Sequence, residues 1–292
     1  MWKRVIRVSL LPILFALVVM MPLSVFAASS PHKAHFFLKS SVHKINRFAS
    51  NNLNYGGGPV MSGTTNVYAI FWEPTGNVQS GYNSLIQRYF NDVNGTGLYK
   101  NNTQYKDSSG RYPSAERLVA SWVDTSAYPE SPLLDSDIQN EVSNAQSVKG
   151  WSSSNNNIFF VFLEANEDLC FDSSGSQCAS NAFCAYHNYF GSNTIYAAMP
   201  YAASFSCNPG SSPNQNDADQ TINVTSHEQM EAATDPLLNA WTDSSGSEIG
   251  DKCAWNFASL NASGGDVTWN SHSYIVQKEW DNARSGCVIS GP

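Results

Sequence analysis

Hydrophobic runs of strand length recur through the chain and are separated by loops rich in Asn, Ser and Gly. A β-branched and aromatic run closed by a turn or a proline is typical of a buried strand, and a uniformly apolar run is typical of a strand inside a sheet. These patterns predict strands within residues 65–74, 117–125, 156–165 and 193–202, and two short strands around a turn within 266–280.

Three other stretches carry apolar residues at helical spacing, and they lie at residues 80–95, 134–151 and 217–236. The last is closed by Pro236, because a proline cannot continue a helix. Strands before and between helices, followed by a loop-rich C-terminal part, predict an α+β (α/β layered) fold.

One domain is predicted to span residues 57–292, because about 235 residues suit a single core. The preceding residues, 28–56, are basic, contain His and are weakly patterned. We interpret them as a linker or a pro-segment.

The first 27 residues have the layout of a secretory signal peptide. Lys3, Arg4 and Arg7 precede a long apolar run that ends in small residues at Ala27. An uncleaved membrane anchor is the alternative, because the run approaches the length that spans a bilayer. Both readings place the body of the protein outside the cytoplasm, and we expect a secreted, extracellular protein that leaves the membrane after signal cleavage.

All six cysteines lie in the C-terminal half of the chain, in a compartment that permits oxidation. Loop closure favours neighbours, so the expected disulfides are Cys170–Cys178, Cys184–Cys207 and Cys253–Cys287. A thiolate zinc site is the alternative, but the sequence contains no CxxC motif.

Charge is unevenly distributed along the chain. Seven of the 16 basic residues lie in the first 50 residues, so nine face all 24 acidic residues in the remainder, a net charge of −15. Such a domain repels phosphate backbones and anionic lipids, so we expect neither nucleic acid nor a membrane surface as a partner.

The sequence "SHEQME" places His227, Glu228 and Glu231 within one helical turn and a half. Residues four apart share a helix face, so His227 and Glu231 can bind one cation, and Glu228 would be the general base that activates water. With six His and ten Glu in 292 residues, an HExxE pattern arises by chance roughly 0.007 times. The alternative is a solvated helix face with acidic side chains.

A catalytic zinc site needs a third protein ligand. Asp235 lies two turns along the helix, about 12 Å away, so we interpret it as part of the helix end. Glu248 and Asp251 follow Glu231 after 16 and 19 intervening residues, a spacing that resembles the third carboxylate of thermolysin-like proteins. His187 is another candidate, or a loop histidine packed on tyrosines.

The predicted cofactor is Zn²⁺ or another divalent metal. One His with two carboxylates leaves a Zn²⁺ site formally neutral, which acidifies bound water less than a two-His site does, and oxygen ligands suit harder cations.

Several blocks resemble the EXORDIUM, or phosphate-induced protein 1, family. "LNYGGGPVMSGTTNVYAIFWEP" resembles its GGP-x-M opening and the strand that follows, and "TINVTSHEQMEAATDPLLNAW", "EIGDKC" and "VQKEW" with Cys287 resemble later blocks, over about residues 53–290. The resemblance implies a secreted cell-wall or apoplast protein linked to growth, not an established enzyme. The plant members lack the His–Glu pair, which in this chain resembles the motif of zincin metallopeptidases.

The zincin resemblance extends to the order of elements. In zincins an edge strand before the active-site helix pairs with extended substrate, and "NTIYAAMPYA" precedes the His227 helix here. We therefore predict a zincin-like peptidase of peptide or protein substrates, with the oligomeric state left open. The alternatives are a non-catalytic wall-associated protein and a glycosidase that uses two carboxylates.

Overall fold

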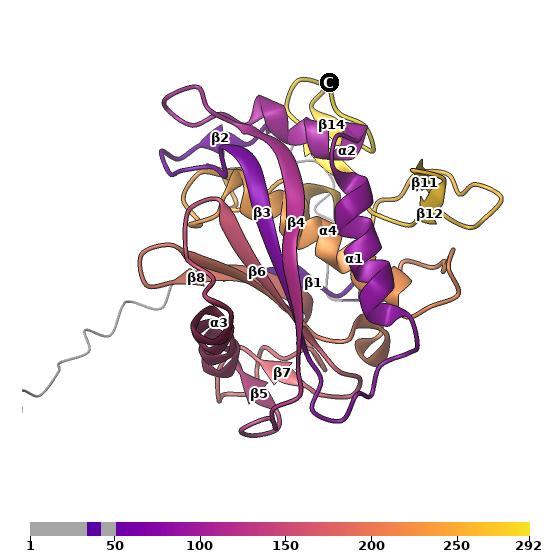
Figure 1. The fold of residues 1–292 in the computed structure, drawn as a ribbon. Coiled ribbons are helices and arrows are strands. Elements are labelled where there is room, and N and C mark those ends of the chain that lie inside the picture. Colours follow the sequence, from indigo (N-terminus) through magenta and orange to yellow (C-terminus); the bar gives the residue numbers. More distant parts are fainter. Residues whose placement is uncertain (1–33, 42–50) are drawn as a thin grey trace, which may run out of the picture. The chain divides into compact units, whose positions relative to one another are not determined.

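A six-stranded mixed sheet forms the centre of the computed structural model, which describes residues 34–41 and 51–292 (Figure 1). Its strand order is β1-β8-β9-β6-β3-β4. The strands are β1 (His35–Leu38), β8 (Phe183–Phe190), β9 (Thr194–Met199), β6 (Asn157–Leu163), β3 (Gly63–Trp72) and β4 (Pro113–Asp124). The four strands β9, β6, β3 and β4 are parallel, whereas β8 runs antiparallel to β9 and β1 antiparallel to β8.

The four parallel strands form where the apolar runs predict them, whereas β1 and β8 lie outside the predicted strands. β6 is buried along its whole length, and alternate residues enter two separate apolar cores, one on each sheet face. A strand covered on both faces reads as a continuous apolar run, which is why β6 lacks polar alternation.

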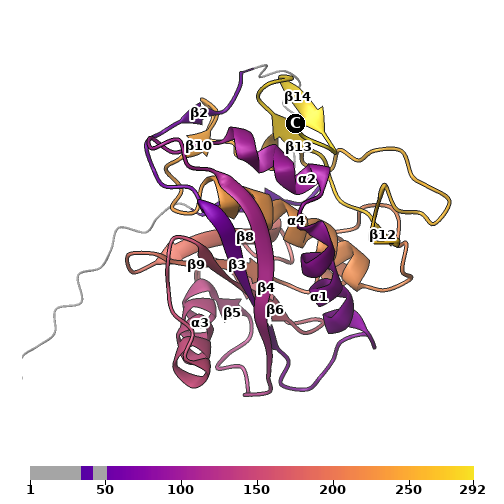
Figure 2. The same ribbon diagram turned by 45° about the horizontal axis from the view of Figure 1, so that its top comes forward.

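Helices cover both faces of the sheet (Figure 2). One face packs against α1 (Tyr82–Val93) and α4 (Ala218–Thr234), and the other against α3 (Asp135–Lys149). These are the three predicted helices. The short α2 (Gly97–Lys100) and the 3₁₀ turns Asn101–Gln104, Ala202–Phe205 and Asp251–Cys253 complete the helical elements of the described residues.

Four two-stranded ribbons lie outside the main sheet. They pair β2 (Asn54–Tyr55) with β10 (Trp241–Thr242), β5 (Leu133–Leu134) with β7 (Leu169–Cys170), β11 (Val267–Trp269) with β12 (His272–Tyr274), and β13 (Glu279–Asp281) with β14 (Gly286–Val288). The β11–β12 ribbon is the pair of strands predicted around a turn. The α+β prediction is therefore confirmed.

The three predicted disulfides, Cys170–Cys178, Cys184–Cys207 and Cys253–Cys287, are all present. They fit an oxidising compartment. Among the described residues, no helix has the length and apolar character that a bilayer crossing requires.

One strand prediction is wrong. β9, the strand before the His227 helix, does not lie at a sheet edge, because it pairs with β6 on one side and β8 on the other. The chain turns back at Gly191 and lays β8 antiparallel beside β9, and β1 then covers β8. The sheet edge on this side of β9 is thus formed by β1, which comes from the N-terminal segment.

The predicted signal peptide, residues 1–27, lies outside the described residues, as do residues 28–33 and 42–50 of the predicted linker or pro-segment. The described part of that segment is built into the fold: Phe37 in β1 and Leu53 before β2 are both buried. Its removal on maturation stays a prediction.

Candidate metal centre

Helix α4 is buried on nearly every side although much of it is polar. All of its residues except Gln220 are buried. Several polar side chains have partners on neighbouring elements: Thr221 bonds the Tyr82 hydroxyl at 2.8 Å, and Gln229 accepts from the Tyr89 hydroxyl at 2.6 Å. Part of the buried polar surface of α4 is therefore hydrogen-bonded by neighbouring elements. Its other polar side chains include His227, Glu228 and Glu231.

Those remaining groups meet side chains from three other segments. His227, Glu228 and Glu231 come from α4, and His187 comes from β8. The loop after β10 supplies Glu248 and Asp251, and the segment up to β13 supplies Gln277 and Glu279. We call these eight residues, together with Asp235 at the end of α4, the His–carboxylate centre.

In a first group of residues, His227, Glu231 and Asp251, the donor atoms lie close enough together to bind one metal ion. His227 Nε2 lies 3.0 Å from Glu231 Oε1 and 3.8 Å from Asp251 Oδ1. The backbone N–H of Asp251 donates to the same Glu231 oxygen at 2.9 Å. The structure thus brings together three of the four ligands predicted from the sequence.

A second group consists of His187, Glu228 and Glu231. His187 Nδ1 lies 3.3 Å from Glu228 Oε2 and 3.7 Å from Glu231 Oε2. Glu248, the fourth predicted ligand, lies on the other side of the same imidazole, with Oε1 3.7 Å from His187 Nε2. Glu231 therefore links the two groups through its two oxygens, and Glu228, the predicted base, lies beside His187.

Some buried oxygens of the centre have no hydrogen-bond partner within the described part of the chain. They include Glu228 Oε1, Glu231 Oε2 and Asp235 Oδ2. A buried carboxylate without a donor is costly, so such atoms call for protons or a cation. The donor set of imidazole nitrogens and carboxylate oxygens fits a divalent metal ion.

Burial shifts the ionisation of these acids. Desolvation raises the pKa of Glu231 to about 7 and, together with the nearby Glu231 carboxylate, that of Asp251 to about 7. The pKa values of Glu228 and Glu248 lie well above 4.5 for the same reason, and burial lowers the pKa of His227. Burial thus disfavours the charged carboxylates, which a cation would stabilise, and favours the neutral His227 imidazole.

Gln277 fixes the state of the His227 ring. Its side-chain oxygen accepts from the Trp255 backbone N–H at 3.2 Å and its nitrogen donates to the Gly250 carbonyl at 2.9 Å. That nitrogen also lies 3.0 Å from His227 Nδ1. Because an amide NH₂ can only donate, His227 Nδ1 accepts, and the ring hydrogen resides on Nε2.

The His187 ring carries its hydrogen on the same nitrogen, Nε2, but it turns the other nitrogen, Nδ1, toward the carboxylates. Its Nε2 lies 3.4 Å from the backbone carbonyl of Asp235, an acceptor, so Nε2 carries a hydrogen. Its Nδ1 faces the carboxylates of Glu228 and Glu231. Asp235, which the sequence placed at the helix end, is the C-terminal cap of α4, and its Oδ1 accepts from the backbone N–H groups of Asn239 and Ala240.

Gly250 packs directly against the centre. A Cβ at this position would lie 2.6 Å from His227 Nδ1 and 3.0 Å from Glu231 Oε1. Only glycine allows the loop before Asp251 to approach this closely.

Sequence reasoning raised His187 only as one option and missed Gln277 as a partner of His227. The partners are separated by 41 residues for His187 and Glu228 and by 50 for Gln277 and His227. No local pattern records such contacts.

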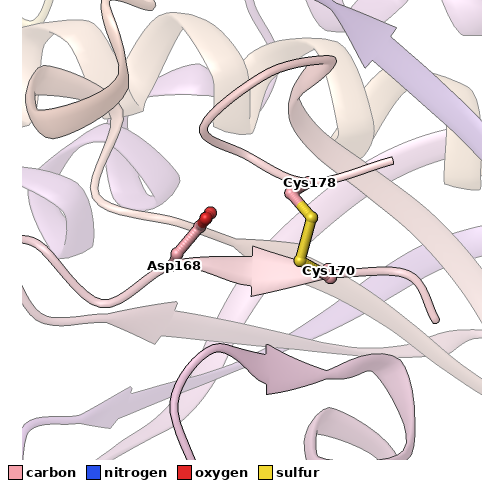
Figure 3. Close-up of side chains that lie close together, drawn as sticks. All are labelled: Asp168, Cys170 and Cys178. Atoms are coloured by element: carbon pink, nitrogen blue, oxygen red, sulfur yellow. A yellow bond between two sulfur atoms is a disulfide. The ribbon is translucent and has the colours of Figure 1, made fainter. Parts of the chain in front are cut away.

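A third cluster, Asp168 with Cys170 and Cys178, also has donor atoms close together. Figure 3 shows the two sulfurs joined in the disulfide, with the Asp168 carboxylate beside them. Disulfide sulfurs are not thiolates, so this cluster is not a metal site.

The fold and the centre define a disulfide-bonded α+β protein with a buried His–carboxylate cluster on one helix. The chain is 24% identical to Protein EXORDIUM-like 5 of Arabidopsis thaliana over an alignment of 297 positions, gaps included, which covers 82% of this chain and 78% of the relative. This match confirms the resemblance to the EXORDIUM family. No family model matches the chain, and no solved structure is significantly similar to it.

Proposed function

We propose that the protein is an exported, metal-dependent hydrolase, a peptidase that holds Zn²⁺ or another divalent cation in the His–carboxylate centre. The observation that carries the proposal is Glu231. Its Oε1 receives the Asp251 N–H, whereas its buried Oε2 has no hydrogen-bond partner within the described residues and lies 3.7 Å from His187 Nδ1. A cation between these atoms would satisfy both.

The ring hydrogens favour His187 as the nitrogen ligand. A metal-bound imidazole coordinates through one nitrogen and donates its other N–H to a carbonyl or a carboxylate. His187 meets this requirement with Nδ1 facing Glu228 and Glu231 and Nε2 against the Asp235 carbonyl. The proposed ligands are His187, Glu228 and Glu231.

His227 then acts as a positioning residue. With Nδ1 accepting from Gln277, its ring hydrogen is on Nε2, which lies 3.0 Å from Glu231 Oε1 without the angle of a hydrogen bond. In the proposal a small turn of the ring or the carboxylate lets Nε2–H hold Oε1, while Oε2 faces the cation. The competing assignment, predicted from the sequence, has His227, Glu231 and Asp251 or Glu248 as ligands and Glu228 as the base.

A bound divalent cation would polarise a carbonyl and acidify water. Asp251 is suited to accept the proton, because 24% of its side chain is exposed, whereas Glu228 and Glu231 are fully buried. A general base must lie within hydrogen-bond reach of the water that it deprotonates. Asp251 is therefore the proposed base when Glu228 is a ligand.

The test is the metal content of the purified wild-type protein and of three variants, measured by mass spectrometry. We expect about one cation per chain in the wild type, loss of it in His187→Ala, and retention in His227→Gln, whose amide can still reach Glu231. His272→Ala is the control, because this partly exposed histidine pairs with Asp92 away from the centre.

Casein hydrolysis with and without a chelator completes the test. Loss of metal in His227→Gln but not in His187→Ala would favour the sequence-based ligand set. A folded wild type with no bound cation would overturn the proposal and favour the non-catalytic alternative, in which His187 simply pairs with Glu228 at 3.3 Å.

A further inference from the structure

The edge of the main sheet next to the centre is occupied by a short strand from the N-terminal segment. β1 pairs antiparallel with β8, and in this register His35 lies opposite His187 and Phe37 opposite Ala185. β1 is thus added to the strand that supplies one histidine of the centre.

Phe37 covers the other histidine. Its ring stacks on the His227 imidazole, with centroids 3.9 Å apart and planes inclined by 11°, and on the Trp255 indole at 4.7 Å. The Phe37 side chain is fully buried. We call the space bounded by the His227 and Trp255 rings the Phe37 seat. Aromatic faces at this separation give both contact area and a preferred orientation, so the Phe37 seat favours a flat ring.

A second aromatic side chain of β1, Phe36, contacts the rings of Phe171, Phe183 and Tyr186 with centroids 5.1–5.3 Å apart. The backbone and Lys39 add polar contacts. The Trp255 indole N–H donates to the Leu38 carbonyl at 2.9 Å, and the Lys39 N–H donates to the Ala182 carbonyl at 3.1 Å. The Lys39 ammonium adds a bond to the Ser180 carbonyl at 3.0 Å. Backbone pairing holds any extended chain, and the side-chain seat supplies the selectivity.

With β1 in place the centre is closed to a large substrate. His187, His227, Glu228 and Glu231 are all 0% exposed. A peptide that reaches them along this edge must take the place of β1, and the contacts of β1 describe what such a peptide would look like.

We infer that the β8 edge with the Phe37 seat is a binding site for extended peptides that carry an aromatic side chain, and that β1 is its built-in competitor. The inference names the substrate class of the proposed hydrolase and rests on that proposal for hydrolysis only. Peptide binding itself requires no metal.

The experiment uses the full chain with Phe37→Asp, which puts a carboxylate into a seat lined by an acidic centre and so weakens the docking of β1. The control is Ser40→Asp, the same charge change at an exposed position. The probe is a fluorescent synthetic peptide of residues 34–41, AHFFLKSS, and its analogue carrying Phe37→Ala.

We expect the peptide to bind Phe37→Asp at least about tenfold more tightly than it binds the wild type or the control, and the analogue to bind about tenfold more weakly, as the loss of a buried phenyl ring implies. Hydrogen exchange of the β8 amides should rise in Phe37→Asp and fall again with peptide. If Phe37→Asp does not fold, Phe37→Ala, which only empties the seat, decides by the same measurements.

Folded variants that bind neither peptide, or bind both equally, would overturn the inference. Metal content is measured on the same samples, with and without chelator. Peptide binding without metal would remove the proposed function and leave this site, whereas metal with no peptide binding would do the reverse.

Discussion

Helices α3 and α4 contain similar proportions of polar residues, yet the protein treats them differently. α3 buries one side against the sheet and exposes the other, whereas α4 is buried almost throughout. The buried acids of α3 include Asp135 in its first turn, which accepts bonds from the hydroxyls of Tyr186 and Tyr196, and the positive end of the helix dipole favours an anion there.

Apart from Asp219 in its first turn, the acids of α4 lie at the other end of their helix. Glu228 and Glu231 belong to its C-terminal half, where the dipole disfavours negative charge, and each has a buried oxygen without a hydrogen-bond partner in the described chain. The comparison teaches that burial of an acid alone does not mark a site. Glu141 of α3 also has a buried oxygen without a hydrogen-bond partner in the described chain, so the feature that sets Glu228 and Glu231 apart is the histidine beside them.

The largest effect is expected for Glu231→Gln, which keeps the shape of the side chain and removes its charge. We expect loss of the bound cation and at least about a 100-fold loss of hydrolysis, since even outer ligand partners account for 10–100-fold. The matched variant in α3 is Glu141→Gln, at a carboxyl that is 4% exposed, and it should keep both. Retention of the cation by Glu231→Gln, measured by mass spectrometry, would contradict the assignment.

A smaller effect should separate two of the disulfides. Cys253–Cys287 spans 34 residues and anchors the loop that carries Asp251, whereas Cys170–Cys178 spans eight. Replacing each pair by serine should lower the free energy of unfolding by about 4 and about 2–3 kcal/mol, respectively, in the chain-entropy account. Urea unfolding measures both. Only the replacement of Cys253–Cys287 should also weaken cation binding. Equal metal affinity in the two variants would show that this disulfide does not support the centre.

The third test concerns the pH dependence of stability that Glu141 of α3 contributes. Burial raises the pKa of Glu141 from 4.5 to about 8, so the folded state holds a proton that the unfolded state releases. The contribution of Glu141 to stability is therefore full below pH 4.5 and is lost as the pH rises toward 8, by up to a few kcal/mol.

Unfolding in urea at pH 5 and pH 8 tests this sign. Glu141→Gln should lose less stability over that interval than the wild type, and an unchanged difference would show that Glu141 is ionised in the folded protein. The acids of α4 would be masked from such a titration by a bound cation, so chelator should enlarge the pH dependence of the wild type but not the part due to Glu141.

Local pattern predicted the three long helices and the four parallel strands, because each of these elements carries its own period. The uniformly apolar β6 and the proline after α4 are properties of a few consecutive residues. The disulfide pairs followed for a similar reason, since short loops close at the smallest entropic cost.

The arrangement of the centre was only partly predictable. His227, Glu231 and Asp251 converge as their spacing indicates, but His187 and Gln277 reach α4 from distant segments, and the Phe37–His227 contact spans 190 residues of sequence. The edge assignment of β9 failed because β1 and β8 add to the sheet beyond it. β1 itself is four residues long and stands in a basic, weakly patterned stretch, so nothing local marks it as a strand.

The ring of Phe37 over His227 also affects when a metal ion could enter and leave the centre. Donor atoms that are shielded on every side exchange with the surroundings only when part of the structure opens. A cation would thus be loaded while the chain is still folding, before the N-terminal strand closes, and would afterwards leave no faster than that strand lifts. The rate at which a chelator removes metal from the folded protein would then report how often the four residues of β1 detach, and Phe37→Ala should increase that rate.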